Sequence, residues 1–477
     1  MDRADLAARI QEILKDRRAS TPAAGGPVAV PAGAPVPAGP RMAEGDEEAA
    51  FAARCAAAEA SSRVLEILGA TLLDGAHGPC VVVDRFYPST GQHGHHHLDR
   101  YLSAARSSMR ALPWFLDRHS AAEAPRPSGD PAPRLVCFDL ETTGLSGGAG
   151  TYAFLVGFGY FDADGFRTRQ FFLRSFGEER ALLRAVEQEV AAGDPASERV
   201  LVTYNGRAFD VPLIDTRYQM HRLEPPFGRL RHVDMLFPAR RLWKGRPRAI
   251  VGRQPSAVRG DDASSPSCSL TAIERDILGL HRQDDVPGWE IPSRYFGYTR
   301  SGDASGLSGV LEHNRLDLVS LGAVAAIVLE MAAGGVSSAR ERHDYLALGR
   351  LFESLGRLDE AERCCEKAAV ADGMAERDHD REIRAAALHW LALRRRHARR
   401  FDQAAEAWLE LTRIPGIESS LRRAALEALA IHHEHRAKDL EQAREFALSA
   451  LELSGDARHV DEVRHRLGRL SKKLGAR

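Results

Sequence analysis

The chain lacks the features that mark several specialised protein classes. Only six of its 477 residues are cysteine, and no two of them have CxxC spacing. This excludes a disulfide-dense scaffold and a cysteine zinc ribbon. Lysine and arginine total 65 against 66 aspartate and glutamate, a formal net charge of −1. A global basic field is therefore absent, so contact with nucleic acid requires a local basic patch.

Long hydrophobic runs suited to a membrane are also missing. The uncharged stretch 19–40 carries six prolines, which a transmembrane helix does not tolerate. The run Leu318–Leu329 has only 12 residues and fits a buried core helix better than a membrane span. The first residues, MDRADLAARIQEILKDRR, are charged throughout and contain no apolar signal region. We therefore expect a cytoplasmic protein with no membrane contact.

Composition predicts four successive segments. We expect an N-terminal arm and disordered Ala/Pro/Gly linker over 1–46, a leader over 47–130 with a helical run Glu59–Leu72 and a strand at 81–87, an α/β domain over 131–335, and helical repeats over 340–477. The proline-rich stretch 124–134 marks the boundary before the α/β domain.

Apolar periodicity predicts the elements of the α/β domain. The expected strands are 135–140, 151–161, 166–173 and 200–204, and the expected helices are 178–192, 210–222, 269–280 and 309–331. The segment 245–267 has little apolar content and is expected to be a mobile loop.

After residue 340 the strand patterns stop and three similar segments follow. Leu358, Phe401 and Leu440 occupy equivalent positions, 43 and 39 residues apart, and each is followed three residues later by an alanine (Ala361, Ala404, Ala443). This pattern predicts tetratricopeptide-like helical hairpins, although the usual period is about 34 residues. Such repeats more often bind protein segments than perform chemistry, so a protein partner is possible here.

The most informative motif is FDLETTG at 138–144. Alternation along a strand places Asp139 and Glu141 on one face and Val136, Phe138 and Leu140 on the other, in the core. Two adjacent carboxylates repel each other unless a cation lies between them, and oxygen ligands favour Mg²⁺ or Mn²⁺. The alternative is an exposed strand end that caps the next turn.

Two later segments add further acids. Asp210 lies where a strand ends and a helix begins, and His313 and Asp317 are four residues apart on one face of a helix. The alternatives are that Asp210 is a helix N-cap and that His313 and Asp317 form a surface pair.

These three segments, in this order, resemble the DEDD exonuclease superfamily with its ribonuclease-H-like fold. More narrowly, the chain resembles the YprB-type ribonuclease-H-like family over about 135–330. The similarity is carried by LSGGAGTYAFLVG after the first motif, DMLFPARRLWK at 234–244, CSLTAIE at 268–274 and DVPGWEIP at 285–292. The segment 81–98 also resembles that family's leader.

The resemblance implies an α/β fold with a mixed sheet and a 3′→5′ exonuclease that hydrolyses phosphodiester bonds of DNA or RNA. It makes Asp139, Glu141, Asp210 and Asp317 the ligands of two Mg²⁺ or Mn²⁺ ions. His313 becomes the general base or a water-orienting residue, although the superfamily usually has a tyrosine at this four-residue spacing or a histidine at five. Thr142, Thr143, Leu145 and Asn205 match positions that meet the terminal nucleotide; the alternative for them is turn chemistry after a strand.

A basic stretch lies beside these motifs. Between 229 and 259 there are nine basic residues against one acid, Asp234, and we expect Arg240, Arg241 and Lys244 to contact the phosphate backbone. The alternative is a solvated loop. We interpret Asp234 as structural. A second basic run, 394–400, is more typical of a solvated helix face.

The sequence leaves two other functions open. One is a catalytically weak nucleic-acid-binding or scaffolding protein that uses the nuclease fold and the repeats for recruitment; the unusual spacing of His313 favours it. The other is zinc binding through His93 and His95–His97, which needs a further ligand.

Overall fold

We describe the protein from a computed structural model. The structure describes residues 59, 61–116, 133–144, 150–192, 198–244, 268–371, 377–453 and 457–475, without the side chains of 457–459. The chain divides into two units, Met1–Glu59 and Ala60–Arg477. The expected arm 1–46 and loop 245–267 lie outside the described residues.

A seven-stranded mixed sheet forms the centre of the N-terminal half of the second unit. Its order is β1 (Thr71–Leu73), β2 (Cys80–Pro88), β7 (Gly165–Phe172), β6 (Ala153–Phe161), β5 (Arg134–Thr142), β8 (Arg199–Thr203) and β9 (Arg231–Asp234). β5, β8 and β9 are parallel to one another, and the other neighbours are antiparallel. The expected α/β class with a mixed sheet flanked by helices is confirmed.

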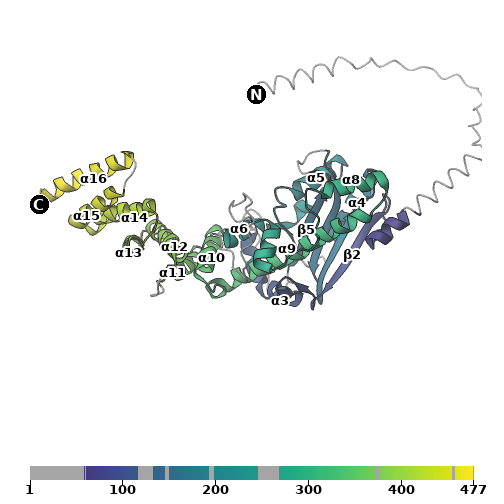
Figure 1. Ribbon diagram of the computed structural model, residues 1–477, viewed down its shortest axis with the longest axis horizontal. Coiled ribbons are helices and arrows are strands. Elements are labelled where there is room, and N and C mark those ends of the chain that lie inside the picture. Colours follow the sequence, from purple (N-terminus) through teal and green to yellow (C-terminus); the bar gives the residue numbers. More distant parts are fainter. Residues whose placement is uncertain are drawn as a thin grey trace, which may run out of the picture. The chain divides into compact units, whose positions relative to one another are not determined.

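Helices cover both faces of this sheet (Figure 1). One face packs against α4 (Glu179–Ala191), α5 (Asp210–Met220) and α8 (Ile291–Ser301), and the other against α3 (Leu98–Ser108), α6 (Leu236–Trp243) and α9 (Ser308–Gly334). Val136 and Phe138 of β5 lie in the first core, as expected. Cys137 on the opposite face is equally buried, so β5 is covered from both sides up to its acidic end.

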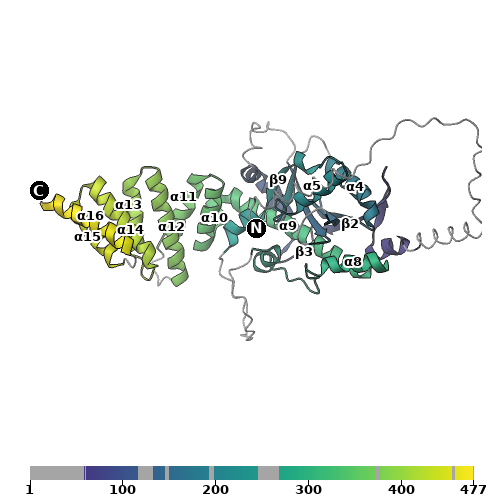
Figure 2. The same cartoon turned by 90° about the horizontal axis from the view of Figure 1, so that it is seen from above.

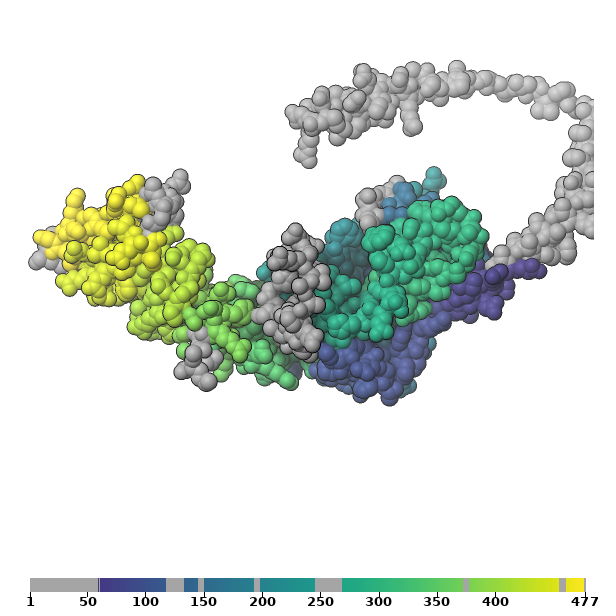
Figure 3. All heavy atoms as spheres, viewed as in Figure 1, coloured from purple at the N-terminus to yellow at the C-terminus, as the bar shows by residue number. Residues whose placement is uncertain are grey.

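The leader is part of the same sheet. β2 pairs with β7 from Val81 to Pro88, with Val82 opposite Phe171. In Figure 3 residues 61–116, in purple and blue, form part of the surface of the α/β region. The expected helix to Leu72 is too long, because Gly69 adopts φ +57 and the chain enters β1 at Thr71.

The segment 269–280 is helical but not a regular α-helix. A short α7 (Leu270–Ile273) continues as a π-helical turn, η4 (Glu274–Leu278), which ends at Gly279 with φ 69. The 3₁₀ segment η1 (Met109–Phe115) and the β3 (Gln92–His93) and β4 (His96–His97) hairpin complete the α/β region with three short 3₁₀ turns.

The C-terminal part is all helical. It consists of α10 (Arg342–Ser354), α11 (Leu358–Ala369), α12 (Asp378–His397), α13 (Phe401–Thr412), α14 (Ser419–His432), α15 (Leu440–Glu452) and α16 (Ala457–Gly475), with η6 (Gly335–Ser338) before α10 and a π-helical turn, η7 (His433–Ala437), before α15. The helices follow one another in sequence order (Figure 2). Ala361, Ala404 and Ala443 lie on α11, α13 and α15, and each is 0% exposed. The equivalent positions predicted from the sequence therefore pack alike, while the tetratricopeptide class stays a prediction.

One helical segment, Ser305–Ser338, is long and apolar enough to cross a membrane by length and composition alone. Of its most apolar window, 67% is buried inside the fold. Leu318 and Leu329 are both 0% exposed, which is the expected behaviour of a core helix.

Candidate active site

The end of β5 supplies two carboxylates. Asp139 and Glu141 lie on the face that Cys137 shares with α9, and Asp139 is opposite Gly157 of β6. Asn314 of α9 donates from Nδ2 to Asp139 Oδ2 at 2.7 Å. Because the helix that covers this face, α9, also carries Asp317, strand and helix bring these acids together.

Asp210 enters from the parallel strand β8. It is the first residue of α5, whose N-cap is Phe209 without a side-chain capping bond. The turn before it contains Asn205 at φ 67, a conformation that asparagine tolerates better than most residues. Asp234 holds this turn: its carboxylate accepts the backbone N–H groups of Asn205 at 2.8 Å and Arg207 at 3.1 Å. Asp234 is therefore structural, as predicted.

The third contribution comes from α9. Glu141, His313 and Asp317 each offer a ligand atom, and these atoms lie within 4.8 Å of one another. His313 Nε2 is 3.5 Å from Asp317 Oδ2. All three side chains are only partly buried. The i, i+4 spacing of His313 and Asp317 thus places both on the helix face that meets β5.

The electrostatics of the cluster reflect this convergence. Burial, together with the negative charges of Asp317, Asp210 and Glu141, raises the pKa of Asp139 well above its usual range. Burial and the charges of Asp317 and Asp210 likewise raise the pKa of Glu141. The pKa of Asp210 rises to about 7 through burial and then Asp234 and Asp317. Mutually repelling carboxylates with a few accessible oxygens are a donor set that fits Mg²⁺ or Mn²⁺.

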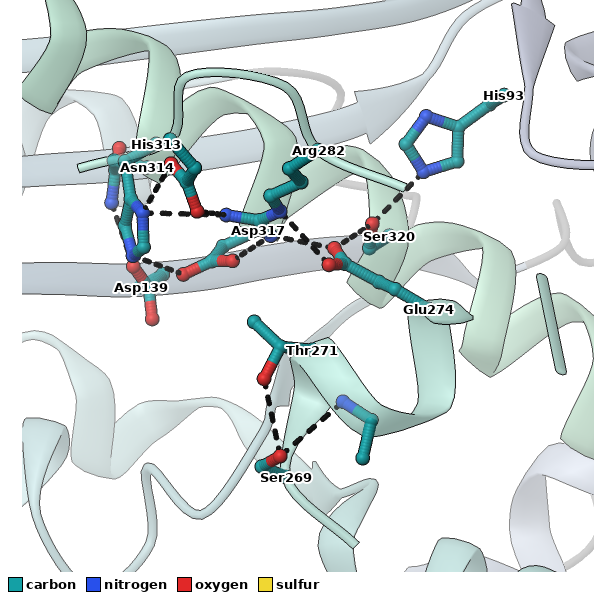
Figure 4. Close-up of polar contacts among 12 residues, drawn as sticks. His93, Asp139, Ser269, Thr271, Glu274, Arg282, His313, Asn314, Asp317 and Ser320 are labelled. Atoms are coloured by element: carbon teal, nitrogen blue, oxygen red, sulfur yellow. Dashed lines mark hydrogen bonds and ion pairs between the residues drawn. The ribbon is translucent and has the colours of Figure 1, made fainter. Parts of the chain in front are cut away.

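An arginine that the sequence did not single out lies beside Asp317 (Figure 4). Arg282 contacts Glu274, Asp285 and Asp317 at once. Asp285 in turn accepts a hydrogen bond from His313 Nδ1 at 2.8 Å. The only earlier signal for this group is the DVPGWEIP motif, which begins at Asp285.

A buried amide pair holds the other side of the cluster. Gln170 of β7 and Asn314 are both 0% exposed. Gln170 Nε2 donates to Asn314 Oδ1 at 2.8 Å, which leaves the Asn314 amide N–H₂ directed at Asp139. Asn314 follows His313 in the sequence motif, so its position was visible there, but its partner Gln170 is 144 residues away.

The residues expected at the terminal nucleotide make turn contacts. Thr142 donates to the carbonyl of Gly144 at 2.9 Å, and Thr143 Oγ1 accepts the N–H of Tyr152 at 2.9 Å. These contacts agree with the structural alternative for both threonines. Leu145 lies outside the described residues, and a nucleotide-binding role for these residues and Asn205 stays a prediction.

Only part of the basic stretch forms a common surface. Arg240, Arg241 and Lys244 are exposed and line a cavity of about 570 Å³ next to Phe237 and α10. Arg229 and Arg231 do not line it; they are ion-paired with Glu224 and Glu198 at 2.7 and 3.3 Å. The three cations expected to contact phosphate therefore share one cavity, and their contact with a phosphate backbone stays a prediction.

The histidine cluster of the leader has other partners. His93 is buried, its Nε2 lies 2.9 Å from Ser320 Oγ, and burial lowers its pKa to about 4. His97 Nδ1 lies 2.8 Å from the carbonyl of Thr90. Within the part of the chain that the structure describes, none of these histidines belongs to a group suited to a metal ion. Zinc binding through them is therefore not supported.

Comparison with known proteins agrees with this architecture. A model of the RNase_H superfamily matches residues 136–328, which contain all four acids. "Uncharacterized protein YprB" of Bacillus subtilis (strain 168) is 30% identical over 352 residues, covering 72% of this chain and 75% of that protein. The superfamily match indicates nuclease-type activity on nucleic acid. The chain belongs to the ribonuclease-H-like family of YprB.

Proposed function

We propose that the chain is a metal-dependent 3′→5′ exonuclease that hydrolyses phosphodiester bonds of DNA or RNA. The observation that carries this proposal is the convergence of Asp139, Glu141, Asp210 and Asp317 from three separate segments. Besides burial, the charges of Asp317 and Asp210 raise the pKa of Asp139 and Glu141, and the charge of Asp317 contributes to the raised pKa of Asp210. A cluster of partly buried carboxylates destabilises the fold unless cations neutralise it. The polarity of attack rests on the resemblance to the DEDD superfamily.

In this proposal the four carboxylates hold two Mg²⁺ or Mn²⁺ ions. When bound, such a pair activates a water and stabilises the attacking and leaving oxygens of an in-line displacement. The chain's own groups orient the reactants. Asn314 fixes one oxygen of Asp139. His313 Nδ1 lies 2.8 Å from Asp285 Oδ1, which places Nε2 on the side of the cluster. His313 Nε2 then accepts the proton of the attacking water.

The basic groove beside the cluster supports a polynucleotide substrate. Arg240, Arg241 and Lys244 form no ion pair with any described residue, so their charges remain available to phosphates. Arg207 and Asp234 line the same cavity and belong to the contacts that set the turn before Asp210. Asp234 is 4% exposed and its carboxylate accepts backbone N–H groups, so the cavity presents mainly basic groups to a strand.

The experiment is hydrolysis of 5′- and 3′-labelled DNA and RNA with Mg²⁺ or Mn²⁺. We expect stepwise shortening of 5′-labelled strands by the wild type, and loss of at least a hundredfold in rate for Asp139→Asn, which keeps the side-chain shape. Asp84→Asn, at an exposed site on β2, is the control and should retain wild-type activity.

Inactivity of the wild type on both polymers under both metals would contradict the proposal. If that protein still bound the oligonucleotides, the scaffolding alternative would replace it. Release of internal fragments in place of terminal nucleotides would contradict the exonuclease mode of cleavage but would still show nuclease activity.

A further inference from the structure

We propose that Arg282 is a positioning residue of this site: an internal cation that fixes Asp317 directly and His313 through Asp285. The inference rests on the proposed function and deepens it by naming a group that no motif identified. Arg282 touches neither substrate nor the reacting atoms; it acts on the residues that do.

The guanidinium is anchored from behind by Glu274. Arg282 Nε donates to Glu274 Oε2 at 2.8 Å and Nη2 donates to Oε1 at 2.5 Å, a bidentate pair. The two side chains are 6% and 1% exposed. Ser320 of α9 also donates to Glu274, and His93 Nε2 lies 2.9 Å from Ser320 Oγ (Figure 4). The pair is thus held by a strand hairpin of the leader and by the core helix together.

The front of the guanidinium faces the acidic cluster. Arg282 Nη2 also donates to Asp317 Oδ1. This leaves Oδ2 of Asp317 on the side of His313, 3.5 Å from its Nε2. Because Arg282 holds Oδ1, the carboxylate of Asp317 has a fixed orientation. Asp317 can then offer its other oxygen to a metal ion together with Glu141 and His313.

The same guanidinium orients the imidazole. Arg282 Nη1 donates to Asp285 Oδ2 at 3.2 Å, and Asp285 Oδ1 accepts from His313 Nδ1 at 2.8 Å. Each oxygen of Asp285 therefore has one defined partner. This arrangement fixes the orientation of the ring, with Nδ1 toward Asp285 and Nε2 toward Asp317. Arg282 Nη1 also lies 3.4 Å from His313 Nδ1.

The planar fork of arginine is essential to this role. One guanidinium contacts three carboxylates in different directions, which the single ammonium of lysine does not reproduce. Arg282→Lys keeps the charge and changes only the geometry, so it separates positioning from simple neutralisation. Arg294→Lys is the matched control, because Arg294 pairs with a single carboxylate, Glu290, at 3.0 Å.

The test measures Mn²⁺ binding by calorimetry, turnover on a labelled strand, and thermal unfolding of each metal-free protein. We expect Arg282→Lys to bind Mn²⁺ at least tenfold more weakly and to turn over at least tenfold more slowly than Arg294→Lys. Wild-type Mn²⁺ affinity and turnover in a folded Arg282→Lys protein would overturn the inference.

A second variant keeps the test decisive if Arg282→Lys does not fold. Asp285→Ala leaves the buried Arg282–Glu274 pair intact and removes the carboxylate that accepts from His313 Nδ1. We expect turnover at least tenfold below wild type with Mn²⁺ affinity retained; unchanged turnover would overturn the route through Asp285. If the wild type itself binds no Mn²⁺, the proposed function fails. If Asp139→Asn loses Mn²⁺ binding and Arg282→Lys retains it, only the inference about Arg282 fails.

Discussion

At the scale of single residues, Asp139 depends on a neighbour that has no side chain. A Cβ on Gly157 would lie 2.3 Å from Asn314 Oδ1 and 2.9 Å from a methyl group of Leu318. Because Gly157 has no Cβ, the side chain of Asn314 can lie close to β6 and donate its hydrogen bond to Asp139 on the neighbouring strand, β5. Glycine is therefore required at position 157 by a close approach.

Gly157→Ala should displace Asn314 and with it Asp139. We expect turnover to fall about 10- to 100-fold, as for a misplacement of about 1 Å, and the free energy of unfolding to fall by about 1–3 kcal/mol through overpacking. Gly297→Ala on α8 is the control, because no atom lies within 4 Å of its Cβ. Equal turnover of the two variants would show that the position of the Asp139 side chain does not depend on Asn314.

The raised pKa values predict that metal affinity depends on pH. The pKa of Asp210 rises from 3.8 to about 7, so the folded chain binds this proton more tightly than the unfolded chain. The stabilisation by the proton is present at low pH and is lost as pH rises through about 7. The proton competes with the cation, so Mn²⁺ affinity should increase by up to about tenfold per pH unit, for each proton displaced, as pH rises toward 7.

This dependence can be measured by calorimetry in two buffers of different ionisation enthalpy, which also counts the protons released. Above about pH 7, where Asp210 is already ionised, the part of the pH dependence that comes from Asp210 should disappear. An affinity that stays constant between pH 5.5 and 7 would mean that Asp210 does not bind the metal.

Local rules predict only the pairs of site residues within one segment, and the set of four acids followed from the resemblance to the DEDD superfamily. Alternation on a strand pairs Asp139 with Glu141, and helical spacing pairs His313 with Asp317. Arg282 and Gln170 could not be predicted in the same way. Their contacts with α9 depend on where a loop and a distant strand fold, and neither lies within a periodic pattern shared with the acids.

At the scale of elements, the leader is structurally part of the sheet. Val81, Val82 and Val83 of β2 are each at most 1% exposed. In the sheet, β7 lies between β6 and β2. Sequence predicted the strand itself from its run of β-branched residues. Its pairing partner, more than 80 residues later, is a long-range choice that periodicity does not encode.

A fragment that begins at Pro131 should therefore fail to fold, whereas one that begins at Glu59 should unfold cooperatively. The shorter fragment loses β1, β2 and α3 and exposes both β7 and the apolar side of the sheet. Circular dichroism during heating checks this. A cooperative transition in the shorter fragment would show that the α/β domain is independent of the leader.

At the scale of the whole molecule, a net charge of −1 means that long-range attraction does not bring nucleic acid to the protein. Binding must depend on the local groove of α6, whose far wall is α10 of the helical part. The sequence identified the basic residues of this groove. It did not reveal that the helical part lines it, because that requires the packing of α10 on α6.

Alanine at Arg240, Arg241 and Lys244 together should weaken binding of a single-stranded oligonucleotide and flatten its salt dependence. Loss of three phosphate contacts predicts that the slope of log K against log salt changes by about 2. The control replaces Arg300, Lys438 and Arg444, which are also exposed. Equal slopes for the two triple variants would rule out the groove as the strand's path.

The π-helical turn Glu274–Leu278 has a consequence for sequence change in this family. A π turn contains one more residue than the α turn it replaces. Deletion of a single residue there would let the segment relax to an α-helix and rotate Glu274 away from Arg282. The spacing between Glu274 and Arg282 should accordingly tolerate many substitutions but no insertion or deletion.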